Sequence, residues 1–389
     1  MSTGFRVALD VETSRTYGRG ILRGISKYLL SSRPWSIYIE QHELTGDVNR
    51  LLSRWDGDGI ITRQLSPEAK SIIESRDISA IDLSNFLPPM GIHRICSADR
   101  AIGRLGAQHF IERGFRNFAC CEYQGQYWSQ QRTKGFVEGI EFSNYECKVY
   151  EQPFRVQAQK WNQDQDSLAK WLAALPKPVA VLATNDLLGH HVLDACSRAE
   201  LLVPEQIAVL GVDDDDLICN LTNPPMSSII LDTERIGFEA AKSLDKLMQR
   251  EGPVPNEKEM LEIPSLGIAV RQSTDSYAVP DPEVARALRY IREHACEGAT
   301  VQDVLDHLQV SRSWLERSFR EYFGRSPKTE IRNVQIERCK ELLRMTDLSL
   351  DCIARLAGYK HTEYMGVVFK RETGMTPGSY RDQKDQLDV

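Results

Sequence analysis

A short segment beginning at Ser311 carries basic and small polar residues at helical spacing. An arginine on such a helix can donate two hydrogen bonds to O6 and N7 of one guanine in the major groove of DNA. Ser311 suits the start of the helix, because its hydroxyl can accept a free backbone N–H. The expected DNA-contacting side is made of Ser311, Arg312, Ser313, Arg317 and Arg320, with Trp314, Leu315 and Phe319 as the buried stripe. The alternative is a solvated charged face on a structural helix bundle.

An internal repeat favours a DNA-binding helix over a structural helix bundle. Residues 319–327, FREYFGRSP, recur as residues 369–377, FKRETGMTP, at an offset of 50 residues. A helix, a tight turn and a second helix are expected before each copy, which is the pattern of a helix-turn-helix whose second helix enters the major groove. Lys328–Met345 is expected to join the two units as one long helix. Such a joint suits two recognition helices spaced about one DNA turn apart, roughly 34 Å.

The second repeat offers fewer side chains that can read bases. Its candidate DNA contacts are His361, Thr362, Glu363 and Lys370. Between them stand Gly366, which costs about 1 kcal/mol of helix stability relative to alanine, and Val367, which cannot hydrogen-bond a base. We therefore expect this helix mainly to position the domain on phosphates, while specificity comes from the first recognition helix.

A second group of polar residues lies at or near the ends of short apolar runs in the first 270 residues. In open α/β sheets the ligand binds at the carboxyl ends of the parallel strands. The candidates for ligand contact are Glu12, Asp99, Arg132, Asn185 and Asp213, with Tyr17, Trp128 and Trp161 as candidate stacking rings. Three alternatives stay open, namely Trp161 packing on a lobe surface, Tyr17 as a surface residue and Asn185 as a helix cap. The acidic run Asp213–Asp216 lacks the alternating spacing of a calcium site, so we expect no metal and no cofactor.

The elements that must position these residues change in kind along the chain. Up to about residue 270, strands alternate with amphipathic helices, which indicates parallel sheets covered by helices. The expected strands are Arg6–Val11, Ser36–Glu40, Gly59–Thr62, Ala80–Leu83, Asn117–Cys121, Val179–Ala183 and Ile207–Val212. Beyond the polar, proline-containing stretch 271–282 only helical patterns remain. We expect a two-lobed α/β domain over residues 1–270, a linker over 271–282, and an all-α domain with two helix-turn-helix units over 283–389.

Composition excludes several classes of protein. The 389 residues are 41% hydrophobic and 26% charged, as in a globular chain, and no apolar run approaches the length of a membrane helix. The formal net charge is −7, but from Asp281 onward 18 basic residues balance 18 acidic ones, which still permits DNA binding on one face. Nine cysteines without metal-ligand spacing and no recognisable signal peptide predict a cytoplasmic protein.

The repeat closely resembles the DNA-binding domain of the AraC/XylS family of transcription regulators. The residues that carry the likeness are Gly358-Tyr359, Phe369-Lys370, Gly374, Thr376-Pro377 and Tyr380-Arg381. The preceding part resembles the periplasmic-binding-protein-like effector domain of LacI-type repressors, in Ser97–Ala119, Ala183–Asp186 and Leu210–Asp214. The likeness extends over nearly the whole chain.

This combination of domains implies a sugar-responsive, DNA-binding transcription regulator. Its implied ligand is D-xylose or another pentose, and its implied role is the activation of pentose catabolism genes. The resemblance also implies a homodimer that contacts operator DNA and RNA polymerase and no membrane. A pyranose offers hydroxyl edges to polar side chains and C–H faces to aromatic rings, which fits the residues at the strand ends.

Other functions remain as alternatives. The sensor could respond to another small molecule, or be vestigial in a constitutive DNA-binding protein. A transport protein would need a signal peptide, and the repeat would have no use in it. An enzyme is disfavoured, because the chain has no GxSxG, P-loop or HExxH motif.

Overall fold

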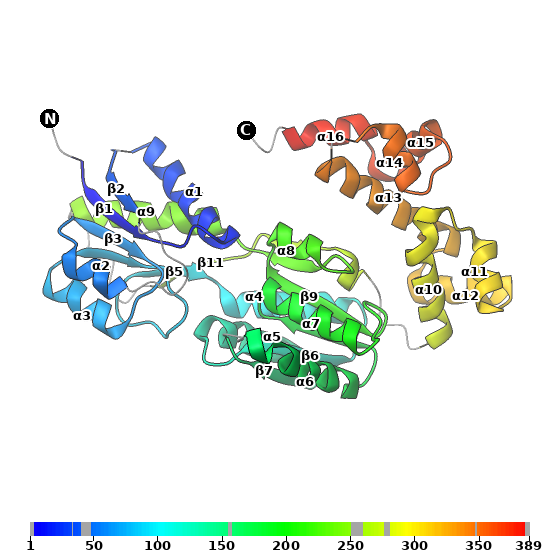
Figure 1. Ribbon diagram of the computed structural model, residues 1–389, viewed down its shortest axis with the longest axis horizontal. Helices are drawn as coiled ribbons and strands as arrows, with labels where there is room; N and C mark the ends of the chain where they lie inside the picture. Colours follow the sequence, from blue (N-terminus) through cyan, green and yellow to red (C-terminus); the bar gives the residue numbers. More distant parts are fainter. Residues whose placement is uncertain are drawn as a thin grey trace. The chain divides into compact units, whose positions relative to one another are not determined.

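The computed structural model describes residues 4–32, 34–39, 48–154, 158–249, 260–275, 281–346 and 348–385. The chain forms two compact units, Met1–Ala278 and Val279–Val389 (Figure 1). In the described residues no helix is both long and apolar enough to cross a bilayer.

The N-terminal unit contains two six-stranded sheets, one in each of two lobes. The first lobe has the all-parallel order β11-β5-β4-β3-β1-β2. Its strands are β1 Arg6–Asp10, β2 Ser36–Ile39, β3 Gly59–Thr62, β4 Ser79–Asp82, β5 Arg94–Ser97 and β11 Met260–Ile263. The second lobe has the order β12-β10-β9-β8-β6-β7, in which only β12 pairs antiparallel. Its strands are β6 Asn117–Tyr123, β7 Cys147–Gln152, β8 Val179–Ala183, β9 Ile207–Asp213, β10 Ser227–Ile230 and β12 Gly267–Ala269.

Helices cover both faces of each sheet, which is why the central strands are apolar on both sides. In β8, for example, Val181 and Leu182 point into cores on opposite faces of the second sheet. The helices of the first lobe are α1 Thr16–Leu30, α2 Val48–Arg54, α3 Pro67–Ser75 and α9 Thr233–Gln249. Those of the second lobe are α4 Asp99–Glu112, α5 Tyr127–Phe142, α6 Trp161–Ala174, α7 Asp186–Arg198 and α8 Asp216–Leu221.

The chain passes between the lobes at three places in the described residues. The crossings join β5 to α4, β10 to α9, and β11 to β12. The backbone N–H of Ala98 in the first crossing donates to the carbonyl of Ile263 at 2.9 Å, so two of the crossings lie side by side. We call these three short segments the hinge. The arrangement confirms the predicted two-lobed α/β fold.

The first residues of the predicted linker, from Arg271 to Ser273, are packed against the second lobe. Arg271 pairs with Asp214 at 2.8 Å, and the hydroxyl of Ser273 donates to the carbonyl of Val209 at 2.6 Å. Residues 276–280 of the predicted linker lie outside the described residues. The first helix of the second unit then begins at Pro282, where Asp281 accepts the backbone N–H of Glu283.

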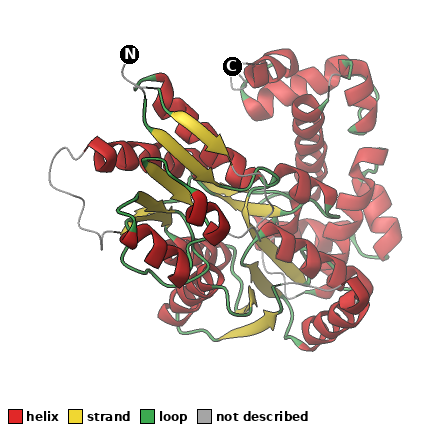
Figure 2. Ribbon diagram, turned by 60° about the vertical axis from the view of Figure 1, so that its left-hand side comes forward, coloured by secondary structure: helices red, strands yellow, loops and turns green. Residues whose placement is uncertain are grey.

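The C-terminal unit is helical throughout its described residues, which confirms the predicted all-α domain (Figure 2). Its helices are α10 Pro282–His294, α11 Val301–Leu308, α12 Arg312–Phe323, α13 Pro327–Met345, α14 Leu350–Leu356, α15 Thr362–Thr373 and α16 Pro377–Asp385. Two cores lie along α13, one with α11 and α12 and the other with α14 and α15. Ile331 belongs to the first core and Ile336 to the second, so the long helix joins two helix-turn-helix units as the repeat predicted.

Gly358, in the turn after α14, is where the two halves of this unit meet most closely. Its φ is +81°, and a Cβ built on it would stand 2.6 Å from the carbonyl oxygen of Ala295. The amide of Gln335 on α13 donates to that same oxygen at 2.9 Å. A glycine is therefore needed both for its backbone conformation and for space.

Gly358→Ala is expected to lower the stability of the C-terminal unit more than Gly374→Ala does. Gly374 has an almost equal φ of +80° but open space where a Cβ would stand. The control should cost about 1–2 kcal/mol for the left-handed backbone alone. The overlap at Gly358 should add about 1–3 kcal/mol. Thermal unfolding of the full chain, followed by far-UV circular dichroism, measures the difference, and equal losses in the two variants would contradict the steric argument.

Candidate ligand cleft and nucleic-acid interface

A cleft of about 550 Å³, including solvent at its open mouth, lies in the N-terminal unit between the two lobes. The first lobe contributes Glu12, Arg15, Tyr17, Arg63, Asn85 and Phe86, and the second contributes Trp128, Arg132, Phe154, Asn185 and Asp213. Of the eight residues predicted from strand ends and aromatic rings, six line it.

Arg132 on α5 is the central cation of the cleft. Its Nε donates to Asp99 at 2.8 Å, and its Nη1 donates to the carbonyl of Thr184 at 2.7 Å and to Asp213 at 3.3 Å. The guanidinium carbon lies 4.9 Å from the centre of the Trp128 ring. None of these bonds within the described residues uses Nη2.

Two glycines let α4 and α5 approach closely enough to form this network. A Cβ on Gly103 of α4 would stand 2.0 Å from the carbonyl oxygen of Arg132, and one on Gly135 of α5 would stand 2.0 Å from that of Arg100. Both positions therefore exclude any other residue without a shift of the backbone. The contact sets the distance between Asp99, the first residue of α4, and Arg132.

Asp99 stands behind Arg132 and does not line the cleft. Burial raises the pKa of its carboxyl to about 6, although Arg132 acts in the opposite direction. Its second oxygen accepts a hydrogen bond from the amide of Asn85, which belongs to the first lobe. Asp99 therefore orients Arg132 and at the same time ties the loop after β4 to the second lobe.

Asp213 ends β9 with its backbone in the left-handed half of conformational space, at a φ of +117°. Such a conformation is strained for a residue with a side chain and is often found at functional sites. Burial raises the pKa of Asp213 above its ordinary value, while Arg132 and then Arg63 lower it. Two other acids of the run Asp213–Asp216 have partners within the second lobe. Asp214 pairs with Arg271, and Asp215 caps α8 by accepting the N–H of Ile218.

The first lobe lines its side of the cleft with three polar residues that contact one another, Glu12, Arg63 and Tyr17. Arg63 is ion-paired with the buried Glu12, and its guanidinium carbon lies 4.3 Å from the centre of the Tyr17 ring. Burial lowers the pKa of Arg63 to about 10. Its Nε is buried without a hydrogen-bond partner, which leaves a donor unsatisfied in the absence of a ligand.

Asn185 serves two purposes at once. Its side-chain oxygen accepts the N–H of Leu188 at 2.9 Å and so caps α7, while the residue also lines the cleft. Tyr17 is packed against the lobe cores rather than lying free on the surface.

Trp161 is placed elsewhere. It begins α6 and packs edge-to-face on His191, with ring centres 4.7 Å apart, and it is not among the residues that line the cleft.

The two lobes are also bonded directly across the cleft. The first backbone N–H groups of α5, from Tyr127 and Trp128, donate to the carbonyls of Phe86 and Asn85 at 3.1 and 2.8 Å. Phe86 packs edge-to-face on Phe154 of the second lobe, with ring centres 6.3 Å apart. Two free N–H groups at a helix start are thus satisfied by the opposite lobe.

Sequence reasoning missed five of the lining residues, namely Arg15, Arg63, Asn85, Phe86 and Phe154. Arg63 directly follows β3 and Asn85 lies three residues after β4, so the rule that ligands bind at strand ends could have found both. Phe154 follows β7, a strand that the sequence pattern did not predict.

The cleft suits a neutral ligand with many hydroxyl groups. The guanidinium groups of Arg15, Arg63 and Arg132 are matched by the carboxyl groups of Glu12, Asp99 and Asp213, so the site and its support carry no net formal charge. Tyr17, Trp128, Phe86 and Phe154 provide apolar faces beside the polar atoms. Charged donors, acceptors and rings in this combination can bind the edges and faces of a sugar ring.

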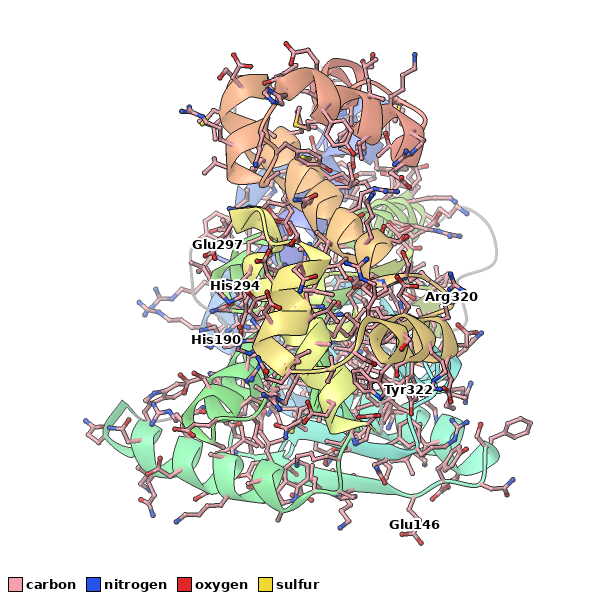
Figure 3. All side chains as sticks on the ribbon, turned by 90° about the vertical axis from the view of Figure 1, so that its right-hand side faces the viewer. Glu146, His190, His294, Glu297, Arg320 and Tyr322 are labelled. Carbon is pink, nitrogen blue, oxygen red and sulfur yellow. The ribbon has the colours of Figure 1, made fainter. Side chains whose placement is uncertain are left out.

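In the C-terminal unit, the residues predicted to contact DNA through the first recognition helix are all exposed. Ser311 caps α12 by accepting the N–H of Trp314 at 3.2 Å, while Leu315 and Phe319 are buried. The exposed candidates are Ser311, Arg312, Ser313, Arg317 and Arg320, and Figure 3 shows Arg320 at the margin of the unit. At about 100° per residue, Ser313, Arg317 and Arg320 share the outward face, and Arg312 at the helix start is rotated by about 140° from Arg317.

The candidates on the second recognition helix, α15, are less uniform. His361 precedes the helix without capping it, and the hydroxyl of Thr362 already donates to Asp351. Glu363 and Lys370 are exposed. Both recognition helices end in the same way, on a left-handed glycine, Gly324 in one and Gly374 in the other.

Comparison with known proteins agrees with this division of the chain. Residues 6–86 match the family described as the XylR N-terminal domain, residues 107–274 match the periplasmic binding protein-like domain, and residues 304–383 match a helix-turn-helix domain. The xylose operon regulatory protein of Haemophilus influenzae is 33% identical over 97% of this chain and 98% of its own. The protein of that name from Escherichia coli K12 is 30% identical over 98% of each chain.

A solved structure of a xylose-binding transcription activator is 29% identical and superposes with a TM-score of 0.80, covering 98% of both chains. These matches confirm the resemblance inferred from the repeat and from the effector segments. The chain therefore belongs to the family of the xylose operon regulatory proteins, which are AraC-type DNA-binding transcription regulators with a periplasmic-binding-protein-like sugar-binding domain and are not enzymes.

Proposed function

We propose that this regulator responds to D-xylose and activates genes of pentose catabolism. The observation that carries the proposal is the cleft around Arg132, balanced in charge and lined by aromatic rings, in a chain that aligns end to end with xylose operon regulatory proteins. Another pentose is the second candidate, because the same cleft chemistry suits its hydroxyl groups equally well.

Each cleft residue has a proposed role. Arg132 donates through Nη2 to a sugar hydroxyl, and Asp213 accepts from a neighbouring one. On the first lobe, Glu12 accepts from a hydroxyl and the free Nε of Arg63 donates to another. Asn185 offers its amide N–H atoms, since its oxygen is already used as a cap. Trp128 and Tyr17 cover the C–H faces of the ring, and Asp99 acts as a positioning residue for Arg132. We assign no sugar contact to Trp161.

The proposed switch is closure of the two lobes about the hinge. A sugar that contacts both lobes favours the closed arrangement, and it shifts the equilibrium only by its difference in affinity for the two states. The protein acts as a cytoplasmic homodimer, and closure changes how the helix-turn-helix units of the dimer engage operator DNA and RNA polymerase. The exposed face of α12 supplies the base contacts of the first unit.

The sugar is identified by a thermal-shift panel of pentoses and hexoses on the purified full chain. A ligand that binds the folded state raises apparent stability by RT ln(1 + [L]/Kd), which is about 2.7 kcal/mol at a hundredfold excess over Kd. D-xylose is expected to raise the unfolding temperature of the N-terminal unit, and the other sugars to raise it less. A larger shift with another pentose would replace xylose as the ligand.

Operator binding tests the switch itself. DNA selected from a random pool should bind more tightly when the sugar is present, and the ratio of the two affinities measures the coupling. DNA binding that no sugar alters would identify a constitutive DNA-binding protein.

A further inference from the structure

The two recognition helices present different chemistry at equivalent positions. With the offset of 50 residues, Leu315 and Phe319 of α12 correspond to Met365 and Phe369 of α15, and all four are buried. At about 100° per residue, the position opposite this buried stripe is Arg317 in α12 and Val367 in α15. An arginine thus stands at the centre of the outward face in one repeat and a valine in the other.

Val367 is 67% exposed, and its neighbour Tyr364 is 58% exposed. A single exposed apolar residue is ordinary on a protein surface and needs no function. The place of Val367 is what makes it informative, since the equivalent residue of the other repeat is the one expected to enter the major groove.

Gly366 is the second, independent observation. It lies in the middle of α15, where glycine costs about 1 kcal/mol relative to alanine. A Cβ built on it would meet no heavy atom within 4 Å, so nothing in the described residues of the unit requires a glycine there. The equivalent residue of α12 is Glu316, which shows that the motif itself accepts a long side chain. No contact within the described residues of the unit accounts for the glycine.

The charges around this face suit DNA. Lys360 before the helix and Lys370 and Arg371 near its end are exposed around Val367 and Tyr364. Two carboxylates lie among them: Glu363 is exposed on the same face, and Glu372 pairs with Arg371 at 2.8 Å, so the cations outnumber the carboxylates by three to two. Cationic side chains around a short apolar centre complement phosphates on either side of a groove. In the major groove, the apolar group that a side chain can recognise is the C5 methyl of thymine.

We propose that Val367 reads the C5 methyl group of a thymine in the second half-site, and that Gly366 lets the backbone of α15 approach the base edges closely enough for a short side chain to reach it. The two half-sites are then read by different chemistry: Arg317 recognises a guanine by hydrogen bonds, and Val367 recognises a thymine by apolar contact. The inference rests on the proposed operator binding and extends it to base specificity.

The test uses the full chain and a duplex selected from a random pool, with and without D-xylose. Each thymine of the selected duplex is replaced in turn by deoxyuridine, which removes only the methyl group. Wild-type protein should lose about three- to fivefold in affinity at one or two positions of the second half-site, the effect of one buried methyl group. Val367→Ala should bind the thymine duplex with a similar loss and show no further loss with deoxyuridine at those positions.

Arg317→Ala is the matched control, because it changes the equivalent position of the other repeat. It should leave the deoxyuridine effect in the second half-site unchanged. Gly366→Leu adds a second readout, since leucine favours helix and its Cβ meets open space. This variant should unfold at the same temperature or higher, and yet bind the selected duplex at least about tenfold more weakly, because the new side chain holds α15 away from the bases.

The outcomes separate this inference from the proposed function. If Val367→Ala loses as much affinity as the wild type when deoxyuridine replaces each thymine, Val367 does not contact a thymine methyl group. That result would overturn this inference but leave the proposed operator binding intact. Unchanged DNA binding with reduced transcription in Val367→Ala would identify this face as a protein contact instead. A pool that yields no duplex under either condition would refute operator binding, and this inference with it.

Discussion

Arg132→Met is expected to abolish the response to sugar and to lower the free energy of unfolding of the N-terminal unit by about 3–5 kcal/mol. The variant keeps the apolar length of the side chain and removes the guanidinium. Asp99 and Asp213 would then lose their shared partner inside the protein, and the carbonyl of Thr184 would lose a donor. Thermal-shift titration with D-xylose measures both effects, as a lower unfolding temperature and as the absence of a ligand-dependent rise.

Two further variants make that result interpretable. Arg104→Met on α4 removes an exposed arginine that pairs with Glu138, and such surface pairs contribute about 0–1 kcal/mol, so both stability and response should persist. Arg132→Lys keeps a positive charge but cannot reproduce the planar, multiple hydrogen bonding of a guanidinium. We expect it to fold and to respond weakly. A sugar affinity in Arg132→Lys equal to that of the wild type would contradict the central role of the guanidinium.

Arg317→Ala should weaken operator binding by about 1–3 kcal/mol and relax discrimination at a single base pair. Arg317 is exposed on the outward face of α12, between Ser313 and Arg320. Its loss removes paired hydrogen bonds to a base rather than a general attraction to phosphate. Competition binding with duplexes altered one base pair at a time measures the effect, and the weakening should disappear on duplexes that already lack the recognised base pair.

Arg338→Ala is the control for this prediction. That arginine lies on α13 and pairs with Glu341, so its replacement should change affinity little and equally for all duplexes. If Arg317→Ala weakens binding equally for every duplex, Arg317 contacts phosphate instead of a base. In that case the slope of log affinity against log salt concentration should fall in magnitude by about one unit.

Most of the helical unit could be predicted because its information is local, although the last helix, α16, was not expected. Each helix-turn-helix is about 25 residues long, and most of its boundaries carry a local signal, such as the caps Thr300, Ser311 and Ser349 or the left-handed glycines Gly324 and Gly374. Lys328–Met345 was expected as the joining helix, and α13 begins one residue earlier at Pro327. Such features depend on neighbours a few residues away, and the duplication made the pattern visible twice.

An apolar run made most of the buried strands predictable, and the exposed edge strand β2 was expected as well. Gly59–Thr62 and Val179–Ala183 are found with the expected bounds, as β3 and β8. In β5 the buried Arg94, which pairs with Asp82 at 2.7 Å, interrupts the apolar pattern, and this strand was missed. The edge strand β7 mixes polar and apolar residues and so lacks the apolar run that marks a buried strand. The strands β10, β11 and β12 were also not expected.

For the cleft, the amino-acid sequence was enough to predict which polar and aromatic side chains are available and at which edge of each sheet they lie. Strand ends supplied Glu12, Asn185 and Asp213, because parallel strands bring their carboxyl ends to one edge. The folded chain was needed to see that the loop at Asn85 and Phe86 meets the start of α5, and that Trp161 packs on His191 away from the cleft. Those contacts join segments far apart in the chain, and they depend on how closely two helices pack and where the hinge crosses, which no short stretch of sequence encodes.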